Sequence, residues 1–350
     1  MKNRLFAVVT LCVLVVNLGG SAFADTKAKK NKKVQTSQLA ALLPASDAVA
    51  TIDIKRFFSD ALPTILSSNQ PMLAMILGKI DEIKAKTGID LRHFEYIAAG
   101  VTAKKMGAKE FDFEPVILAR GQINSAALIG AAKLLSNGKY REEQIGNRTV
   151  YIFSVKEVAA PNKPRATPGK GQNAIDKAIA KLFKELAVTA YDESTLAFGS
   201  PLLIRQTLEA KTKVGAELMG LLGRKEVSVF NFAAKVPAGM RAFAPLDNDE
   251  LGKNIDSIRY LYGSMDVAGD AMNINLTAKT LQTSQARGLL ETLQGLQFIG
   301  KAFLGSSKKP DNQVFARMID NAKFSVKANE VILDLQIPQS DISVLVGALK

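Results

Sequence analysis

Apolar and polar residues alternate along neighbouring segments of this 350-residue chain, and a helical pattern follows each such pair of segments. The clearest pair covers residues 258–267 and 272–279, which are joined by the turn sequence Ala268-Gly269-Asp270. The second segment places Met272, Ile274, Leu276 and Ala278 on one face, and Asn273, Asn275, Thr277 and Lys279 on the other. A period of two is typical of a half-buried strand, so this pair predicts a β-hairpin with one apolar and one polar face.

The same arrangement of a hairpin and a following helix recurs at three other places, beginning near Phe94, Leu186 and Ala322. A further tight hairpin is predicted at Gly146-Asn147. Strands that are apolar on one face only exclude a doubly wound parallel sheet, whose central strands are apolar on both faces. The sequence therefore predicts an α+β fold with antiparallel sheet or sheets built from repeated hairpin-helix units, helices packed on one face, and two similar halves.

A strand and a longer helix are expected before the first of these units. Residues 48–54 are rich in β-branched side chains, as strands are. Asn69 can cap a helix that begins at Gln70 or Pro71, and Gly88 is well placed to end it. The apolar stripe of this helix consists of Leu73, Ile76, Leu77, Ile80 and Ile83.

Composition and patterning divide the chain into four parts. We expect a signal peptide at 1–24, a disordered lysine-rich tail at 25–38, an N-terminal α+β half at 39–212 and a C-terminal α+β half at 213–350. Residues 159–173 contain three prolines and two glycines, which predicts a mobile insertion in the first half. The sequence leaves open whether the two halves share one sheet.

The beginning of the chain has the pattern of a secretory signal peptide. Lys2 and Arg4 precede an apolar run over residues 6–18, and small residues then lead to Ala24. Such a pattern predicts cleavage after Ala24 and delivery to the periplasm or the extracellular space. No second apolar run is long enough to span a bilayer, so no transmembrane segment is expected in the mature chain.

Cysteine usage agrees with this prediction. Cys12 is the single cysteine and lies inside the predicted signal peptide, so the mature chain would have no thiol. Leu11 precedes Cys12, whereas a lipoprotein signal would have a small residue there. We therefore expect neither a disulfide nor a lipid-anchored cysteine, and the hydrophobic core must stabilise the fold without covalent help.

The formal net charge is +13, and part of it is concentrated just after the predicted cleavage site. Residues 25–38 contain one acidic residue, Asp25, and five lysines: Lys27, Lys29, Lys30, Lys32 and Lys33. This segment could contact an anionic surface, such as lipid or polysaccharide. The alternative is a solvated spacer, because no aromatic residues alternate with the lysines. Sequence-specific recognition of nucleic acid is not expected.

Residues that could perform catalysis or hold a metal are few. His93 is the only histidine, which excludes most imidazole-based metal sites and nearly all Ser-His-Asp schemes. Ser306 and Lys309 have Ser-x-x-Lys spacing, but Pro310 follows them and predicts a loop rather than the required helix. The acidic residues at 247–250 are expected to begin a helix. No catalytic residue, metal or cofactor is therefore predicted.

Several short motifs give the chain a resemblance to a known group. They are Leu43-Pro44-Ala45-Ser46-Asp47-Ala48-Val49, Thr87-Gly88-Ile89-Asp90-Leu91, Phe113-Glu114-Pro115-Val116-Ile117 with Arg120-Gly121, Leu196-Ala197-Phe198-Gly199-Ser200, and Tyr262-Gly263-Ser264-Met265-Asp266. With these motifs the mature chain resembles a group of uncharacterised secreted bacterial proteins. The motifs are strand ends, helix ends and turns, so the resemblance implies a fold and no activity.

These observations favour an exported, non-enzymatic protein that binds or scaffolds an envelope partner. Asn273, Asn275 and Lys279 on the polar strand face are the candidate partner-binding residues. Two alternatives remain open. Since 47% of the chain is hydrophobic, a cavity between sheet and helices could carry an apolar or lipid-like molecule. A hydrolase that uses carboxylates alone would need two acidic side chains to converge in a cleft.

Overall fold

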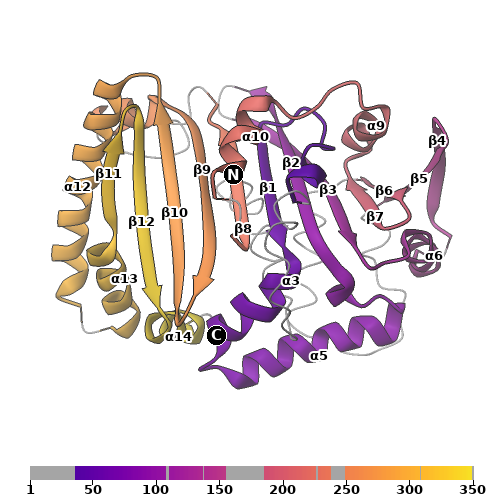
Figure 1. Cartoon of the computed structure of the whole chain (residues 1–350), viewed down its shortest axis with the longest axis horizontal. Coiled ribbons are helices and arrows are strands. Elements are labelled where there is room, and N and C mark those ends of the chain that lie inside the picture. The colour runs from indigo at the N-terminus through magenta and orange to yellow at the C-terminus, as the bar shows by residue number, and fades with distance from the viewer. Residues whose placement is uncertain are drawn as a thin grey trace. The chain divides into compact units, whose positions relative to one another are not determined.

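The computed structural model describes residues 36–107, 110–136, 138–154, 185–225, 228–237, 249–307 and 309–348 (Figure 1). The predicted signal peptide, most of the lysine-rich tail and the insertion at 159–173 lie outside these residues. The chain divides into two compact units. Unit 1 takes its described residues from 36–55 and 76–216, and unit 2 takes them from 56–75 and 217–348.

In unit 1 all the strand pairings are antiparallel, and neighbouring strands follow the order β1, β2, β3, β7, β6, β5, β4. The bounds are β1 Ala48–Asp53, β2 Phe94–Gly107, β3 Glu110–Gly121, β4 Tyr140–Ile145, β5 Arg148–Ser154, β6 Glu185–Asp192 and β7 Thr195–Gly199. The predicted Gly146-Asn147 hairpin is confirmed as β4 and β5, and Gly146 has the positive φ of 61° that this tight turn needs.

Two helices of unit 1, α6 Ser125–Leu135 and α9 Pro201–Glu209, contact these strands. The short helix η2 spans Leu91–His93. Ile129 of α6 packs with Phe153 and Val188 from β5 and β6. Ser200 is the N-cap of α9, and its hydroxyl accepts a hydrogen bond from the Leu203 amide at 3.3 Å. Pro201 occupies the first helical position.

Helices α3 (Ile54–Arg56) and α5 (Gln70–Thr87) contain the points where the chain passes from one unit to the other. The predicted start of α5 is confirmed, because the Asn69 side chain accepts a hydrogen bond from the Met72 amide at 3.2 Å. Its predicted end is confirmed as well, since Gly88 follows with a φ of 72°. Capping signals thus located this helix from the sequence.

Unit 2 also contains only antiparallel pairings, with the strands in the order β8, β9, β10, β12, β11. The strands are β8 Phe230–Lys235, β9 Ile258–Ala268, β10 Ala271–Thr280, β11 Lys323–Lys327 and β12 Glu330–Pro338. The helices are η1 Phe57–Ala61, α4 Leu62–Leu66, α10 Ala216–Leu222, η3 Gly223–Lys225, α11 Asp249–Asp256, α12 Thr283–Gly305, α13 Pro310–Asn321 and α14 Gln339–Ala348.

The core of unit 2 lies between the long helix α12 and the apolar face of its strands. Ala286 and Leu289 of α12 are buried against Ala278 of β10 and Val331 of β12. These strand residues belong to the apolar set that alternation predicts. Figure 1 shows α12 running alongside β10, β11 and β12, which it contacts.

The α+β fold class with antiparallel strands is therefore confirmed. Each predicted hairpin-helix unit is present, as β2-β3-α6, β6-β7-α9, β9-β10-α12 and β11-β12-α14. The similarity of the two halves stays a prediction. One helix departs from the expected arrangement: side chains from the start of α10 and from η3 reach the polar face of the unit 2 strands, opposite to α12.

Candidate functional site

Polar side chains of unit 2 gather on the face of its strands that lies opposite to α12. The pairing register places Asn275 of β10 opposite Ser264 of β9 and opposite Asp334 of β12. Because every second residue of a strand points to the same side, the other members of this face follow from the register. The face also includes Ala233 and Ile332. We call its polar members the polar face: Asn231, Lys235, Tyr260, Tyr262, Ser264, Asp266, Asn273, Asn275, Thr277, Lys279, Lys323, Ser325, Lys327, Glu330, Asp334 and Gln336.

One end of the polar face is bound to α10. The Tyr260 hydroxyl donates a hydrogen bond to the Glu217 carboxylate at 2.6 Å, and Lys279 Nζ lies 3.0 Å from the other carboxylate oxygen. These two hydrogen bonds, that from Tyr260 first, lower the pKa of Glu217, and the Glu217 carboxylate in turn raises the pKa of Tyr260. The Lys279 ammonium also lies over the Tyr260 ring, 5.6 Å from its centroid.

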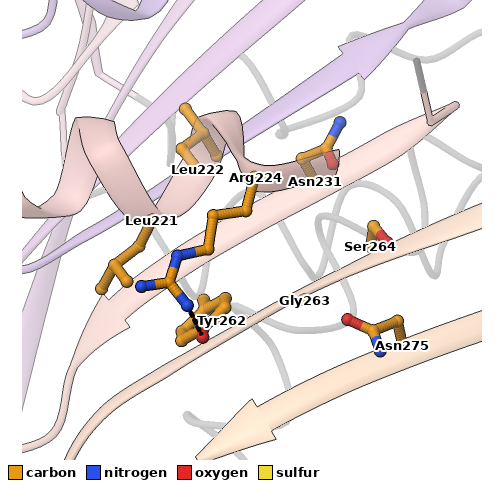
Figure 2. A pocket seen from close by; sticks show the side chains of 8 residues that line it. All are labelled: Leu221, Leu222, Arg224, Asn231, Tyr262, Gly263, Ser264 and Asn275. Atoms are coloured by element: carbon orange, nitrogen blue, oxygen red, sulfur yellow. Dashed lines mark hydrogen bonds between the residues drawn. The ribbon is translucent and has the colours of Figure 1, made fainter. Parts of the chain in front are cut away.

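A second attachment lies two residues further along β9. Arg224 of η3 donates hydrogen bonds to the Tyr262 hydroxyl and to the Glu330 carboxylate of β12, the latter at 2.8 Å (Figure 2). Burial, followed by the negative charge of Glu330, raises the pKa of Tyr262 to about 12. We call Glu217, Tyr260, Lys279, Arg224, Tyr262 and Glu330 together the clamp.

Beside the clamp the polar face is hollowed. Leu221, Leu222 and Arg224 form one wall, and residues of β8, β9 and β10 form the floor (Figure 2). The floor carries Asn231, Tyr262, Gly263, Ser264 and Asn275. The hollow leaves about 10 Å³ for the centre of a water-sized molecule, which is close to the space that one buried water needs. It therefore suits a single water molecule and no larger ligand.

The opposite end of the polar face is bound to α3. Arg56 Nη2 donates a hydrogen bond to Asp266 at 2.9 Å, and Arg56 Nε donates one to Asp60 at 3.1 Å. Between Arg56 and the clamp, residues of β10, β11 and β12 form a mainly polar surface, in which Ile332, opposite Ser325, is an apolar member. We call this surface the polar window: Asn273, Asn275, Lys323, Ser325, Asp334 and Gln336.

Side chains of the polar window offer both donors and acceptors of hydrogen bonds. Ser325, Asp334 and Gln336 are exposed, whereas Asn273 and Asn275 are half-buried. Asn275 Nδ2 donates to Asp334 Oδ1 at 2.7 Å, which orients both side chains across the two strands. The arrangement can recognise polar groups of a partner without further rearrangement of these two residues.

Residues predicted from the sequence are divided between the window and the clamp. Asn273 and Asn275 lie in the polar window, while Lys279 is engaged by Glu217 in the clamp. The lysines predicted to contact an anionic surface, Lys27, Lys29, Lys30, Lys32 and Lys33, lie outside the described residues. His93 is exposed at the end of η2.

Apart from Asn273, Asn275 and Lys279, sequence reasoning missed the residues of the window and the clamp. Asp334 and Gln336 carry the same alternation as Asn273 and Asn275, so the pattern could have revealed them. Glu217 and Arg224 carry no such signal, because they reach the polar face only through tertiary contacts with Tyr260 and Tyr262.

In the part of the chain that the structure describes, no group of three or more His, Cys, Asp or Glu side chains is placed to hold a metal ion. Within the same residues, no helix is sufficiently long and apolar to cross a bilayer.

Comparison with known proteins yields a similarity of fold only. No protein-family model and no curated protein matches this sequence. Among solved structures, crystal form III of TP0453 is similar with a TM-score of 0.43 and 9% identity, over 89% of this chain and 97% of the other. Crystal form I gives a TM-score of 0.42 with 10% identity, and covers the same shares of the two chains. At these values the likeness concerns the general course of the chain and carries no function.

Proposed function

We propose that this protein is an exported, non-enzymatic binding or scaffolding protein, and that it holds an envelope partner through the polar window. The observation that carries the proposal is the mainly polar surface of Asn273, Asn275, Ser325, Asp334 and Gln336, left between two attached ends of one strand face. The predicted signal peptide supports a location in the cell envelope or outside the cell.

The geometry of the window suits a partner that presents backbone or side-chain hydrogen-bonding groups. Amide and hydroxyl groups supply donors and acceptors, and Lys323 and Asp334 add one charge of each sign. Because these groups are held on paired strands, little side-chain entropy is lost when a partner binds. A flat, mixed polar surface of this kind is typical of protein-protein contacts rather than of small-molecule sites.

The alternative function is carriage of an apolar molecule, and the hollow described in unit 2 does not support it. The hollow beside the clamp is lined by Arg224, Asn231 and Asn275 and is smaller than a lipid tail requires. A hydrolase would need two converging carboxylates. Glu217 and Glu330, the acidic residues of the clamp, are each held by a tyrosine, lysine or arginine partner that anchors α10 and η3.

Site-specific photo-crosslinking in an exporting host tests the proposal. A benzophenone amino acid at position 273 should give one discrete cross-linked species on irradiation. A second substitution, Gln336→Arg, places a large cation in the window and should abolish that species. The matched control carries the benzophenone at position 321, an exposed site on α13, and should give no discrete species.

Each other outcome contradicts the proposal. No cross-linked species from position 273, or the same species from position 321, would show that the window holds no specific partner. Native mass spectrometry of the exported chain tests the alternative function directly. An added mass that denaturation releases as a lipid would replace the proposal with the carrier function.

A further inference from the structure

The C-terminal half of α12 exposes large apolar side chains. Relative exposure is 46% for Leu296, 76% for Phe298, 63% for Ile299 and 79% for Phe303. Four such residues within eight positions are unusual for a helix whose other face is packed, since single exposed apolar residues are normal and clusters of them mark an interaction site. We call these four residues the apolar stripe.

Packing of the helix explains why the apolar stripe stays outside the core. The N-terminal half of α12 packs on the strands through Ala286 and Leu289. The C-terminal half packs against α13, where Gln297 Nε2 donates hydrogen bonds to the backbone oxygens of Ile319 and Ala322 at 2.6 and 2.8 Å. At 100° per residue, the four residues of the apolar stripe spread over about 160° on the side of the helix that faces away from Gln297 and α13.

Lysines border the apolar stripe, and Asp320 of α13 pairs with one of them. Between Thr292 and Pro310 the sequence contains three lysines and no acidic residue. Lys309 is exposed, and Lys301, itself 58% exposed, forms an ion pair with Asp320 of α13. Phenylalanines and leucines flanked by lysines are the composition of helices that lie in the plane of an anionic membrane surface.

We propose that the apolar stripe docks on the surface of an anionic lipid bilayer, with α12 parallel to the membrane plane. Phe298 and Phe303 would enter the boundary between headgroups and acyl chains, while Lys301 and Lys309 meet lipid phosphates. Because Lys308 and Lys309 follow the stripe in the sequence of every copy of the chain, it favours an anionic lipid over a second copy as its partner. The inference does not depend on the polar window, which lies on the opposite face of the unit 2 strands.

Absence of tryptophan makes a direct test possible. The chain contains none, so Phe303→Trp introduces a single fluorescent reporter into the apolar stripe. On addition of vesicles of phosphatidylglycerol and phosphatidylcholine, its emission should shift to shorter wavelength and become sensitive to brominated lipids. The matched control is Leu134→Trp on α6, because Leu134 is 79% exposed, as Phe303 is, and lies in unit 1. Its emission should not change.

Flotation of the full chain with the same vesicles measures the affinity. The double variant Phe298→Ser/Phe303→Ser should partition at least about tenfold more weakly than the unchanged chain, given the apolar area removed. Lys309→Gln should weaken binding to anionic vesicles only, and phosphatidylcholine vesicles alone should bind least. Circular dichroism checks that the exposed substitutions leave the fold intact.

Three results would overturn the proposal. The first is equal flotation of the unchanged chain and the double serine variant, which is the result expected if the lysine-rich tail alone binds lipid. The second is no flotation of either protein. The third is concentration-dependent self-association that the serine variant abolishes, because the stripe would then be covered by a second copy of the chain.

Discussion

The hydroxyl of Tyr260 donates a hydrogen bond to the carboxylate of Glu217, with 2.6 Å between the two oxygens. Tyr262, two residues further along β9, accepts a hydrogen bond from Arg224. Residues two apart on a strand share a face, so α10 and η3 are attached to the polar face at two neighbouring points. The clamp therefore determines how much of the polar face stays accessible.

Tyr260→Phe removes the hydroxyl of the first attachment and leaves the ring in place. We expect the free energy of unfolding to fall by about 1 kcal/mol, the usual net value of one hydrogen bond. Amide exchange in residues 216–222 should accelerate, since α10 loses one of its attachments. Hydrogen exchange followed by mass spectrometry measures the second effect.

Tyr191→Phe, in unit 1, is the control for that experiment. It also removes one phenol hydroxyl but should leave exchange in residues 216–222 unchanged. Equal exchange of α10 in the unchanged chain and in Tyr260→Phe would show that the Glu217-Tyr260 contact does not hold the helix.

The Asp90 carboxylate in unit 1 should make the free energy of unfolding depend on pH. Its carboxylate accepts hydrogen bonds from Arg92 Nε at 2.7 Å and Nη2 at 2.9 Å, and these bonds hold the pKa of Asp90 well below its usual range. The pKa is thus lower in the folded than in the unfolded chain. The ionised carboxylate stabilises the fold above about pH 4, and this contribution is lost as the pH falls further.

Asp90→Asn keeps the shape of the side chain and removes the charge. At neutral pH the free energy of unfolding should fall by about 1–2 kcal/mol, as for other hydrogen bonds to charged groups. The difference between the two proteins should narrow progressively below about pH 4, because the carboxylate of the unfolded chain becomes protonated before that of the folded chain. Urea denaturation at a series of pH values measures the free energy of unfolding of both proteins. A difference between them that stays constant across the series would contradict a lowered pKa of Asp90.

Gly263 of β9 is predicted to tolerate no side chain. A Cβ atom there would lie 2.3 Å from the backbone oxygen of Asn275 and 3.1 Å from a ring carbon of Phe232. Gly263→Ala should therefore force β9 and β10 apart and lower the free energy of unfolding by about 1–3 kcal/mol. Gly220→Ala on α10 has open space around the new methyl group and should raise it by about 0.5–1 kcal/mol. Thermal denaturation should show a lower melting temperature for Gly263→Ala and a higher one for Gly220→Ala than for the unchanged chain.

The hairpins could be predicted from the sequence because their signals are local. Residues 258–267 and 272–279 were expected as strands, and the structure forms β9 over Ile258–Ala268 and β10 over Ala271–Thr280. Gly269 supplies the positive φ of 64° in the turn between them. The place of α10 could not be predicted, since a seven-residue helix has little periodicity and Glu217 meets Tyr260 across 43 positions of sequence.

The candidate site shows the same division between local and distant signals. Alternation along β10 was sufficient to place Asn273 and Asn275 on a polar face. That Asp334 lies opposite Asn275 depends on the pairing of β12 with β10, which alternation within either strand does not determine. The sequence predicts Lys279 to bind a partner, as it does for Asn273 and Asn275. Only the tertiary contact with Glu217 shows that Lys279 belongs to the clamp.

The tyrosines provide a last prediction, at high pH. Burial raises the pKa of Tyr262 to about 12, and burial together with the charge of Asp53 does the same for Tyr96 in unit 1. Both phenols are more readily ionised in the unfolded chain, whose tyrosines titrate near pH 10. Stability should therefore be retained up to about pH 10 and decline between about pH 10 and 12, as the unfolded chain releases these protons first.

Absorbance of tyrosinate during alkaline titration separates the phenols with a raised pKa from the others. The chain has six tyrosines. In the folded protein Tyr96, Tyr260 and Tyr262 should titrate late. Tyr262→Phe should remove one of these late phenols without changing Tyr96, because Tyr96 and Tyr262 lie in different units. In urea all six should titrate together near pH 10. If the folded protein also titrates in one step near pH 10, Tyr262 is not buried beneath Arg224, and the clamp does not close this end of the polar face.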